Sequence, residues 1–140
     1  MAGSKKFFVL DASVIIKWIT EEKDSCKAFK IRGDFFSEKI NLGVVAHTFT
    51  EVVNTVARKF PEKAPGFFVD LLDLGMTEYR TDLDIVFTGT EIMQKCEKIS
   101  FYDAAYHALA LKFGGTFITA DEDYYKKAKK LGGIKLLKDY

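Results

Sequence analysis

Short apolar segments alternate along the chain with longer segments of helical character, and this alternation strongly limits the possible folds. The apolar segments, each about the length of one strand, are residues 7–10, 40–45, 116–119 and 134–137, and the less apolar residues 76–80 are a further candidate strand. Strands that are separated by helices cannot pair through tight hairpins, so their sheet is expected to be parallel. The alternation therefore predicts an α/β fold, a three-layer α/β/α sandwich with a central parallel sheet of four to five strands.

The segments between these strands carry the apolar spacing or the end signals of helices. The clearest one stops at Pro61 and has apolar residues at i, i+3, i+4 and i+7, namely Phe49, Val52, Val53, Val56, Ala57 and Phe60. The other expected helices cover residues 12–19, 21–32, 66–74, 81–98, 100–113 and 121–131. With 140 residues and no linker or repeat, we expect a single domain over residues 1–140, with residues 1–5 as a disordered N-terminus.

Composition excludes several classes of protein. The hydrophobic content of 48% suffices for a packed core and argues against a disordered chain. No apolar run approaches the roughly 18 residues of a membrane span and no signal peptide is visible, so we expect no membrane association. Cys26 and Cys96 lie far apart in sequence and cannot build a disulfide framework, which favours a cytoplasmic protein. The net charge of +1 argues against a protein that coats nucleic acid through bulk electrostatics.

Four acidic residues occupy similar positions, where expected helices begin. Asp11 ends the first strand, Asp121 follows the fourth, and Glu51 and Asp103 fall in the first turns of their helices. In a parallel sheet these helix starts share the edge at the carboxyl ends of the strands, where functional side chains gather. We therefore expect the fold to bring the four acids to one edge, although long stretches of sequence separate them.

Each acid also has a structural explanation. Acids in a first helical turn complement the helix dipole, and Thr48-x-x-Glu51 and Ser100-x-x-Asp103 resemble capping boxes. Taken alone, any one of these acids is more often structural than functional. Asp11 is the exception, because a carboxylate at a strand end in the heart of a domain is costly to bury without a cation or several donors.

A divalent cation is the usual remedy where several carboxylates meet and repel one another. Oxygen ligands without clustered His or Cys indicate Mg²⁺ or Mn²⁺ rather than zinc.

At this level of detail the residues resemble the pattern of the PIN-domain family. The resemblance rests on Asp11-x-Ser13, Glu51-x-x-Asn54, Asp103-Ala104-Ala105 and Thr119-Ala120-Asp121, in this order and at suitable spacing. It covers about residues 7–137 and is closest to the VapC-type toxins of toxin–antitoxin pairs. One departure is Ala46-His47-Thr48, where many relatives carry a proline shortly before the helix with the glutamate.

The resemblance implies a Mg²⁺-dependent endoribonuclease, with Mn²⁺ as a substitute, that hydrolyses RNA phosphodiester bonds with metal-activated water. Asp11, Glu51, Asp103 and Asp121 match the acidic quartet that binds the metal and carries catalysis. Supporting roles fall to Ser13, Asn54 and Thr119, and a further auxiliary role to Asp123. The resemblance also implies a homodimer and a small VapB-like antitoxin as partner.

Other readings of the sequence stay open. They are an RNA-processing or RNA-binding PIN domain without a toxin role, and a receiver-like signalling module that binds Mg²⁺. A phosphatase with a strand-end nucleophile usually needs Asp-x-Asp, where this chain has Asp11-Ala12-Ser13. His107 shares a helix face with Asp103, and a structural hydrogen bond is favoured over a metal site; His47 is expected in a loop.

Overall fold

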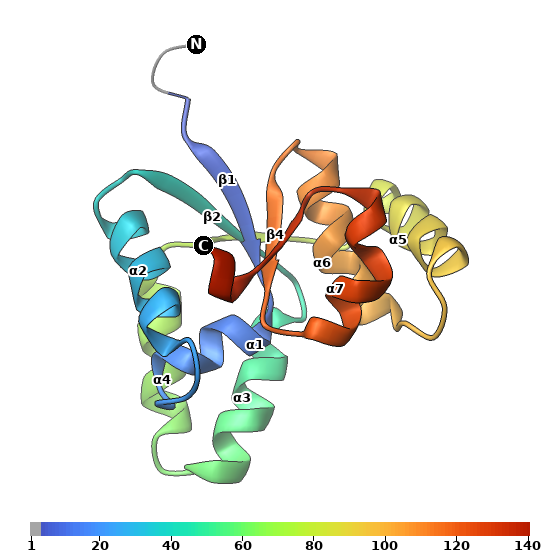
Figure 1. The fold of residues 1–140 in the computed structure, drawn as a ribbon. Helices are drawn as coiled ribbons and strands as arrows, with labels where there is room; N and C mark the ends of the chain where they lie inside the picture. The colour runs from blue at the N-terminus through green and yellow to red at the C-terminus, as the bar shows by residue number, and fades with distance from the viewer. Residues whose placement is uncertain (1–3) are drawn as a thin grey trace.

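The computed structural model describes residues 4–140 and contains one central sheet with helices on both faces (Figure 1). The expected disordered segment 1–5 lies partly outside the described residues; residues 4 and 5 precede the first strand without regular secondary structure. None of the helices in the described part of the chain has both the length and the apolar character that a membrane span requires.

All strand pairs in the sheet are parallel, as the sequence predicts. The strands are β1 (Lys6–Leu10), β2 (Ile40–Val45), β3 (Thr77–Tyr79), β4 (Thr116–Thr119) and β5 (Ile134–Leu136). Their order across the sheet is β3-β2-β1-β4-β5, so the chain builds one half outward from β1 and then returns to add β4 on the other side. The point between β1 and β4, where the direction of winding reverses, is where open α/β sheets bind ligands.

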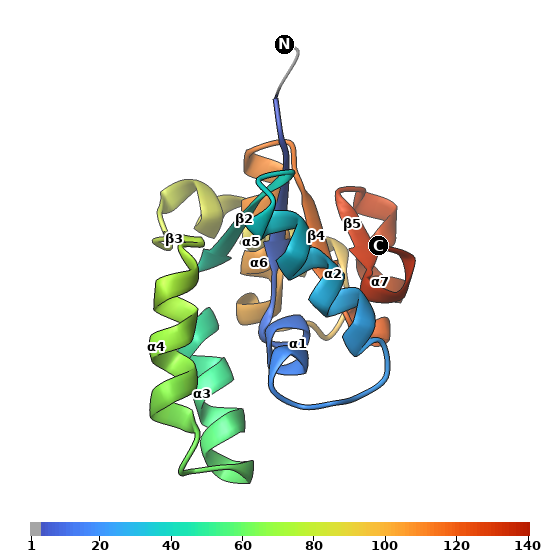
Figure 2. The same cartoon turned by 90° about the vertical axis from the view of Figure 1, so that its left-hand side faces the viewer.

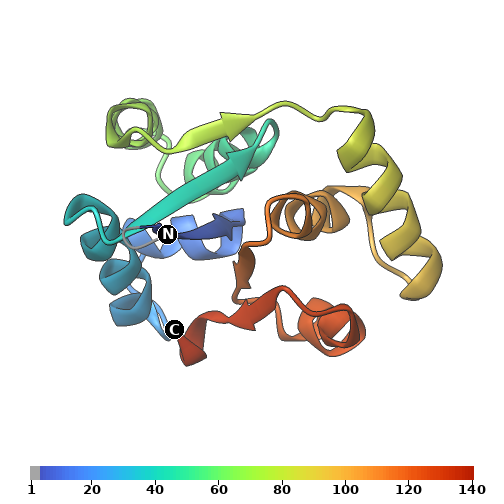
Figure 3. The same cartoon turned by 90° about the horizontal axis from the view of Figure 1, so that it is seen from above.

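Helices cover both faces, which confirms the three-layer sandwich (Figure 3). One face carries α1 (Ala12–Ile15), α2 (Ser25–Phe36), α3 (Thr48–Lys59) and α4 (Ala64–Leu74). The other carries α5 (Leu83–Lys95), α6 (Phe101–Lys112) and α7 (Glu122–Ala128). Short 3₁₀ turns follow at η1 (Ile16–Trp18), η2 (Lys129–Leu131) and η3 (Leu137–Asp139). Figure 2 shows α3 and α4 side by side as a helical pair that reaches beyond the sheet.

Side chains of β1 alternate between the two hydrophobic cores. Phe8 and Leu10 belong to the core under α1–α4, whereas Val9 belongs to the core under α5–α7. Successive strand residues point to opposite faces of a sheet, and both faces of this sheet are covered. This explains why β1 is apolar at every position in its second half.

Several helix boundaries differ from the prediction, and α2 differs most. It begins at Ser25 rather than near residue 21 and runs through Gly33 to Phe36. A glycine inside a helix costs only about 1 kcal/mol relative to alanine. Phe35, beyond Gly33, packs against the core, and this burial outweighs that cost. Similarly, α5 ends at Lys95 rather than near residue 98, because Cys96 is extended and Lys98 is left-handed.

Candidate acidic active site

Asp11 lies at the carboxyl end of β1, beside the reversal point of the sheet. It is the N-cap of α1, and its Oδ1 accepts a hydrogen bond from the Val14 N–H at 3.3 Å. Only 8% of the residue is exposed. Its carboxylate therefore depends on protein donors rather than on water.

Two hydroxyl groups supply most of those donors. Ser13 Oγ donates to Oδ1 of Asp11 at 2.5 Å, and Thr119 Oγ1 donates to Oδ2 at 2.6 Å. Both hydroxyls also accept a backbone N–H, Ser13 from Ala120 at 3.1 Å and Thr119 from Asp121 at 3.0 Å. Because these N–H groups are pure donors, the hydroxyl protons are free to point at the carboxylate. The network ties the end of β1 to the loop that follows β4.

Burial raises the pKa of the Asp11 carboxyl to about 6, against the lowering effect of the hydrogen bonds from Ser13, Thr119 and Val14. The negative charge of Asp103 raises the pKa further. Asp11 is thus an acid whose ionised form lacks a compensating positive charge.

Asp103 lies in the first turn of α6, where the Ser100 hydroxyl accepts its backbone N–H at 3.1 Å. Burial raises the pKa of its carboxyl, and the charges of Asp121 and Glu51 raise it further. The Ser100 side chain and His47 act in the opposite direction. The electrostatic coupling of Asp103 to all three other acids identifies it as the centre of the group.

Asp121 follows β4 and is the N-cap of α7. Its Oδ1 accepts the Tyr124 N–H at 3.0 Å, while its own backbone N–H is held by Thr119. The residue is exposed at the sheet edge. Asp121 therefore combines the capping role that its position suggests with electrostatic proximity to Asp103.

Glu51 lies in the first turn of α3, as expected, but not in a capping box. Thr48 uses its hydroxyl to accept the Val45 N–H at 3.1 Å. The Glu51 carboxylate instead accepts a hydrogen bond from the Tyr106 hydroxyl on α6 at 2.9 Å. His47 Nε2 lies 3.4 Å from the same Oε1.

Tyr106 is a site residue that the sequence motifs do not indicate, whereas His47 lies in the turn before α3, as expected. Tyr106 is 1% exposed, and burial raises the pKa of its phenol, so the hydroxyl keeps its proton as a donor. The available signal was its position three residues after Asp103, one helical turn along α6. His47 is the N-cap residue of α3, where the chain departs from the family pattern.

The remaining predicted residues lie outside this network. Asn54 is exposed on α3, one turn after Glu51, and Asp123 is exposed on α7 in an ion pair with Lys127 at 3.1 Å. His107 is fully buried, with Nδ1 3.0 Å from the Tyr124 hydroxyl and Nε2 2.7 Å from the Gly132 carbonyl. The structural hydrogen bonds favoured for His107 from the sequence are thus present.

The chemistry of the four acids suits a hard divalent cation, which prefers carboxylate oxygens. Within residues 4–140, no three His, Cys, Asp or Glu side chains converge closely enough to hold a metal ion by themselves. Mg²⁺ typically keeps several waters and binds through one or two carboxylates together with substrate phosphates, so a complete protein cage is not required. The residues therefore fit such an ion.

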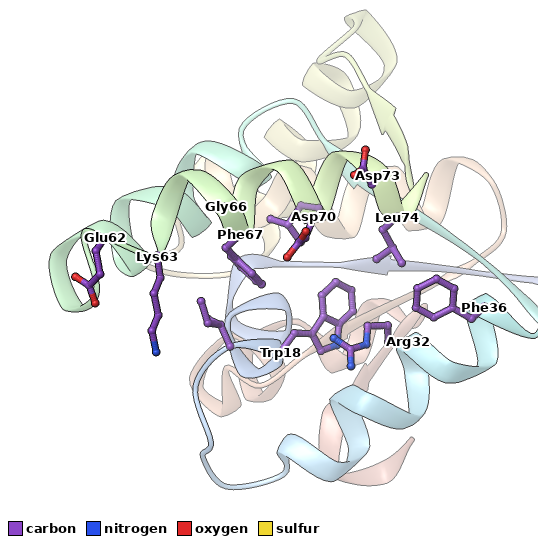
Figure 4. A pocket seen from close by; sticks show the side chains of 12 residues that line it. Trp18, Arg32, Phe36, Glu62, Lys63, Gly66, Phe67, Asp70, Asp73 and Leu74 are labelled. Carbon is purple, nitrogen blue, oxygen red and sulfur yellow. The ribbon is translucent and has the colours of Figure 1, made fainter.

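Two hollows of the described surface lie away from the acids. A groove of about 760 Å³ runs between α4 and the η1–α2 region (Figure 4). Apolar side chains, among them Trp18, Phe36 and Phe67, line it together with charged ones such as Arg32 and Asp70. A second hollow of about 500 Å³ lies between α3 and α4 and is lined largely by apolar residues. None of the four acids contributes to either hollow.

The fold and the acids together define a class: a parallel α/β protein with a carboxylate site at the reversal point of its sheet. The sequence matches the model of the PIN domain family over residues 8–130. Since this match spans most of the chain, the protein belongs to the PIN domain family.

Solved structures of VapC-type toxins share this fold. VapBC2 from Rickettsia felis, bound to a DNA fragment from its promoter, gives a TM-score of 0.67 at 14% identity, covering 93% of this chain and 96% of that one. VapC20 from Mycobacterium tuberculosis, described as a Sarcin-Ricin loop cleaving toxin, gives 0.67 at 16% identity, covering 85% and 93%. A toxin–antitoxin complex from Klebsiella pneumoniae gives 0.69 at 16% identity, covering 92% and 96%. A search of curated proteins finds no significant match.

Proposed function

We propose that this PIN-domain protein is a metal-dependent endoribonuclease that hydrolyses RNA phosphodiester bonds with Mg²⁺, for which Mn²⁺ can substitute. One observation carries the proposal: Asp11, Glu51, Asp103 and Asp121 lie at the same helix-start edge of the parallel sheet, where the charges of Glu51 and Asp121 raise the pKa of Asp103 and the charge of Asp103 raises that of Asp11. Such mutual repulsion has no structural benefit, and it is relieved when a cation binds.

Each acid has a role in this proposal. Asp11 and Asp103 are the principal ligands, while Glu51 and Asp121 hold a second ion, orient water or accept a proton. Ser13 and Thr119 hold both oxygens of Asp11, and we assign Asn54 and Asp123 to supporting positions around the quartet. A bound divalent cation would supply Lewis-acid activation of water and offset the charge that develops on the phosphoryl oxygens.

The proposed partners are taken from the resemblance to VapC-type toxins. We propose RNA as the substrate, a small VapB-like antitoxin as the inhibitor, and the cytoplasm as the compartment; the structural neighbours that are toxin–antitoxin complexes support the antitoxin. Exposed apolar side chains on α5 support a homodimer, namely Leu83, Val86 and Phe87 at 72%, 42% and 66% exposure. Co-expression with any small protein encoded beside this gene, followed by co-purification, tests the antitoxin. Light scattering of wild type and Phe87→Glu tests the dimer.

Cleavage of a mixed structured RNA by the purified chain tests the activity. We expect cutting with Mg²⁺ or Mn²⁺, none with EDTA, and none with Asp103→Asn. Glu91→Gln, which removes an exposed acid on α5, is the matched control and retains activity. Cutting that survives Asp103→Asn would indicate a contaminant and contradict the site. A folded protein that binds RNA and Mn²⁺ but never cuts would favour the alternative of an RNA-binding PIN domain.

A further inference from the structure

Two side chains hold a single oxygen of Glu51. The Tyr106 hydroxyl donates to Oε1 at 2.9 Å, and His47 Nε2 lies 3.4 Å from that atom. Among residues 4–140, one hydrogen bond reaches this carboxylate, and both it and the close approach of His47 fall on Oε1. Oε2 is thus the oxygen of Glu51 that the protein leaves available.

The same two side chains join the helices that carry Glu51 and Asp103. Tyr106 reaches from α6 to Glu51 on α3, and His47, just before α3, places Nε2 3.1 Å from the Tyr102 carbonyl on α6. A carbonyl oxygen and a carboxylate oxygen are both acceptors, so Nε2 of His47 carries a proton. Long side chains, rather than close backbone packing, connect the two helices here.

Tyr106 is well suited to act as a fixed donor. Its ring stacks on Phe117 of β4, with centroids 5.6 Å apart and planes 11° from parallel, and it meets the His47 ring edge-on at 5.1 Å. The ring is fully packed, so the hydroxyl position is set by the core and not by solvent. A carboxylate that accepts a hydrogen bond from this hydroxyl is held in a defined orientation.

We propose that Tyr106 and His47 are positioning residues that fix Glu51 relative to Asp103 and leave Oε2 of Glu51 free to serve the divalent cation. This inference rests on the proposed metal-dependent function. Neither residue touches substrate or metal in this scheme; both act through Glu51.

Mn²⁺ affinity, measured by electron paramagnetic resonance without RNA, tests the inference independently of activity. Tyr106→Phe removes the hydroxyl and keeps the stacked ring. Loss of a group that orients a ligand typically costs at least tenfold, so we expect about a tenfold weaker Mn²⁺ affinity with kcat reduced and KM for RNA little changed. Tyr140→Phe is the matched control, since the Tyr140 hydroxyl also donates to a carboxylate, Asp34, at 2.7 Å but far from the acids.

A double-mutant cycle shows whether Tyr106 and His47 act through Glu51. In a Glu51→Ala background, adding Tyr106→Phe or His47→Ala should produce no further loss of Mn²⁺ affinity. A full additional loss in that background would overturn the inference, as would unchanged affinity in Tyr106→Phe alone. If Glu51→Ala itself changes neither Mn²⁺ affinity nor cleavage, the proposed role of Glu51 fails, which is a different outcome. Thermal unfolding of each variant separates these effects from loss of folded protein.

Discussion

The Thr119 hydroxyl on β4 lies 2.6 Å from Oδ2 of Asp11, the residue that follows β1, although 108 positions separate the two in sequence. The bond crosses the point where the winding of the sheet reverses. Ser13 makes the equivalent bond to the other oxygen of Asp11. The acid at the centre of the fold is thus held in place by hydroxyl groups and not by a basic side chain.

Removing the Thr119 hydroxyl should destabilise the protein. Thr119→Val keeps the shape but leaves Oδ2 of Asp11 and the Asp121 N–H without their partner. Leaving buried polar groups unpaired costs about 1–3 kcal/mol, so the free energy of unfolding in urea should fall by that amount. Thr119→Ser keeps both bonds and is the control. Equal stability of Thr119→Val and wild type would show that the hydroxyl network contributes nothing.

The elevated pKa of Asp11 predicts a pH-dependent stability. In the folded protein the pKa is about 6, against 3.8 for the ordinary group, so between these values the folded state binds more protons than the unfolded state. The stability contribution of Asp11 is therefore greatest at low pH and is lost as the pH rises from about 4 through 6. The shift corresponds to about 3 kcal/mol. In urea unfolding with EDTA, the stability of wild type relative to Asp11→Asn should fall as the pH rises from about 4 to 6; parallel curves for the two proteins would refute the prediction.

Binding of Mn²⁺ should stabilise the wild-type protein, because a cation favours the ionised carboxylates that now repel one another. Thermal unfolding with Mn²⁺ in place of EDTA should raise Tm, and an ion at 100 times its Kd adds about 2.7 kcal/mol. The increase should disappear in Asp103→Asn and persist in Glu91→Gln. An equal increase in all three proteins would place the ion elsewhere.

Much of the fold could be read from the sequence because its signals are local. Apolar runs of strand length and helical spacing predict the sandwich with four to five parallel strands. The expected helix end at residue 74 is also confirmed, because α4 ends at Leu74 and Gly75 follows it in the left-handed conformation. Helix ends were less accurate where packing decides them. Phe35 packs on a core formed from distant segments, and this contact favours the extension of α2 past Gly33. A local sequence pattern does not reveal such a contact.

The predicted site residues reach the expected sheet edge, but their partners could not be foreseen. Tyr106 and His47 meet Glu51 only because α3 and α6 start at the same edge, and that meeting depends on side-chain geometry rather than on spacing. Asn54 shows a different limit of the motif: it lies one turn from Glu51 at a motif position, yet it is exposed to solvent. Its supporting role, like that of Asp123, stays a prediction.

His107 should contribute to stability and not to catalysis. Burial lowers the pKa of His107 below the ordinary value of 6.5, so as the pH falls the unfolded state takes up a proton before the folded state does. The stabilising effect of neutral His107 is therefore complete above pH 6.5 and is lost as the pH falls below that value. This trend opposes that of Asp11. His107→Leu leaves the Tyr124 hydroxyl and the Gly132 carbonyl unpaired, which should cost about 1–3 kcal/mol in urea unfolding. Cleavage per folded molecule should be retained, and its selective loss would assign His107 to the site.

Replacing glycine by alanine should have opposite effects on stability at two positions of this chain. A Cβ on Gly115, just before β4, would lie 2.4 Å from the Phe7 carbonyl oxygen of β1, and this backbone cannot move away without disturbing the strand pair. Gly115→Ala should therefore destabilise the protein by at least about 2 kcal/mol. A Cβ on Gly33 in the interior of α2 meets nothing within 4 Å, so Gly33→Ala should stabilise it by up to about 1 kcal/mol. Urea unfolding of the two variants checks both signs, and a stable Gly115→Ala would mean that β1 and β4 are not packed as closely as described.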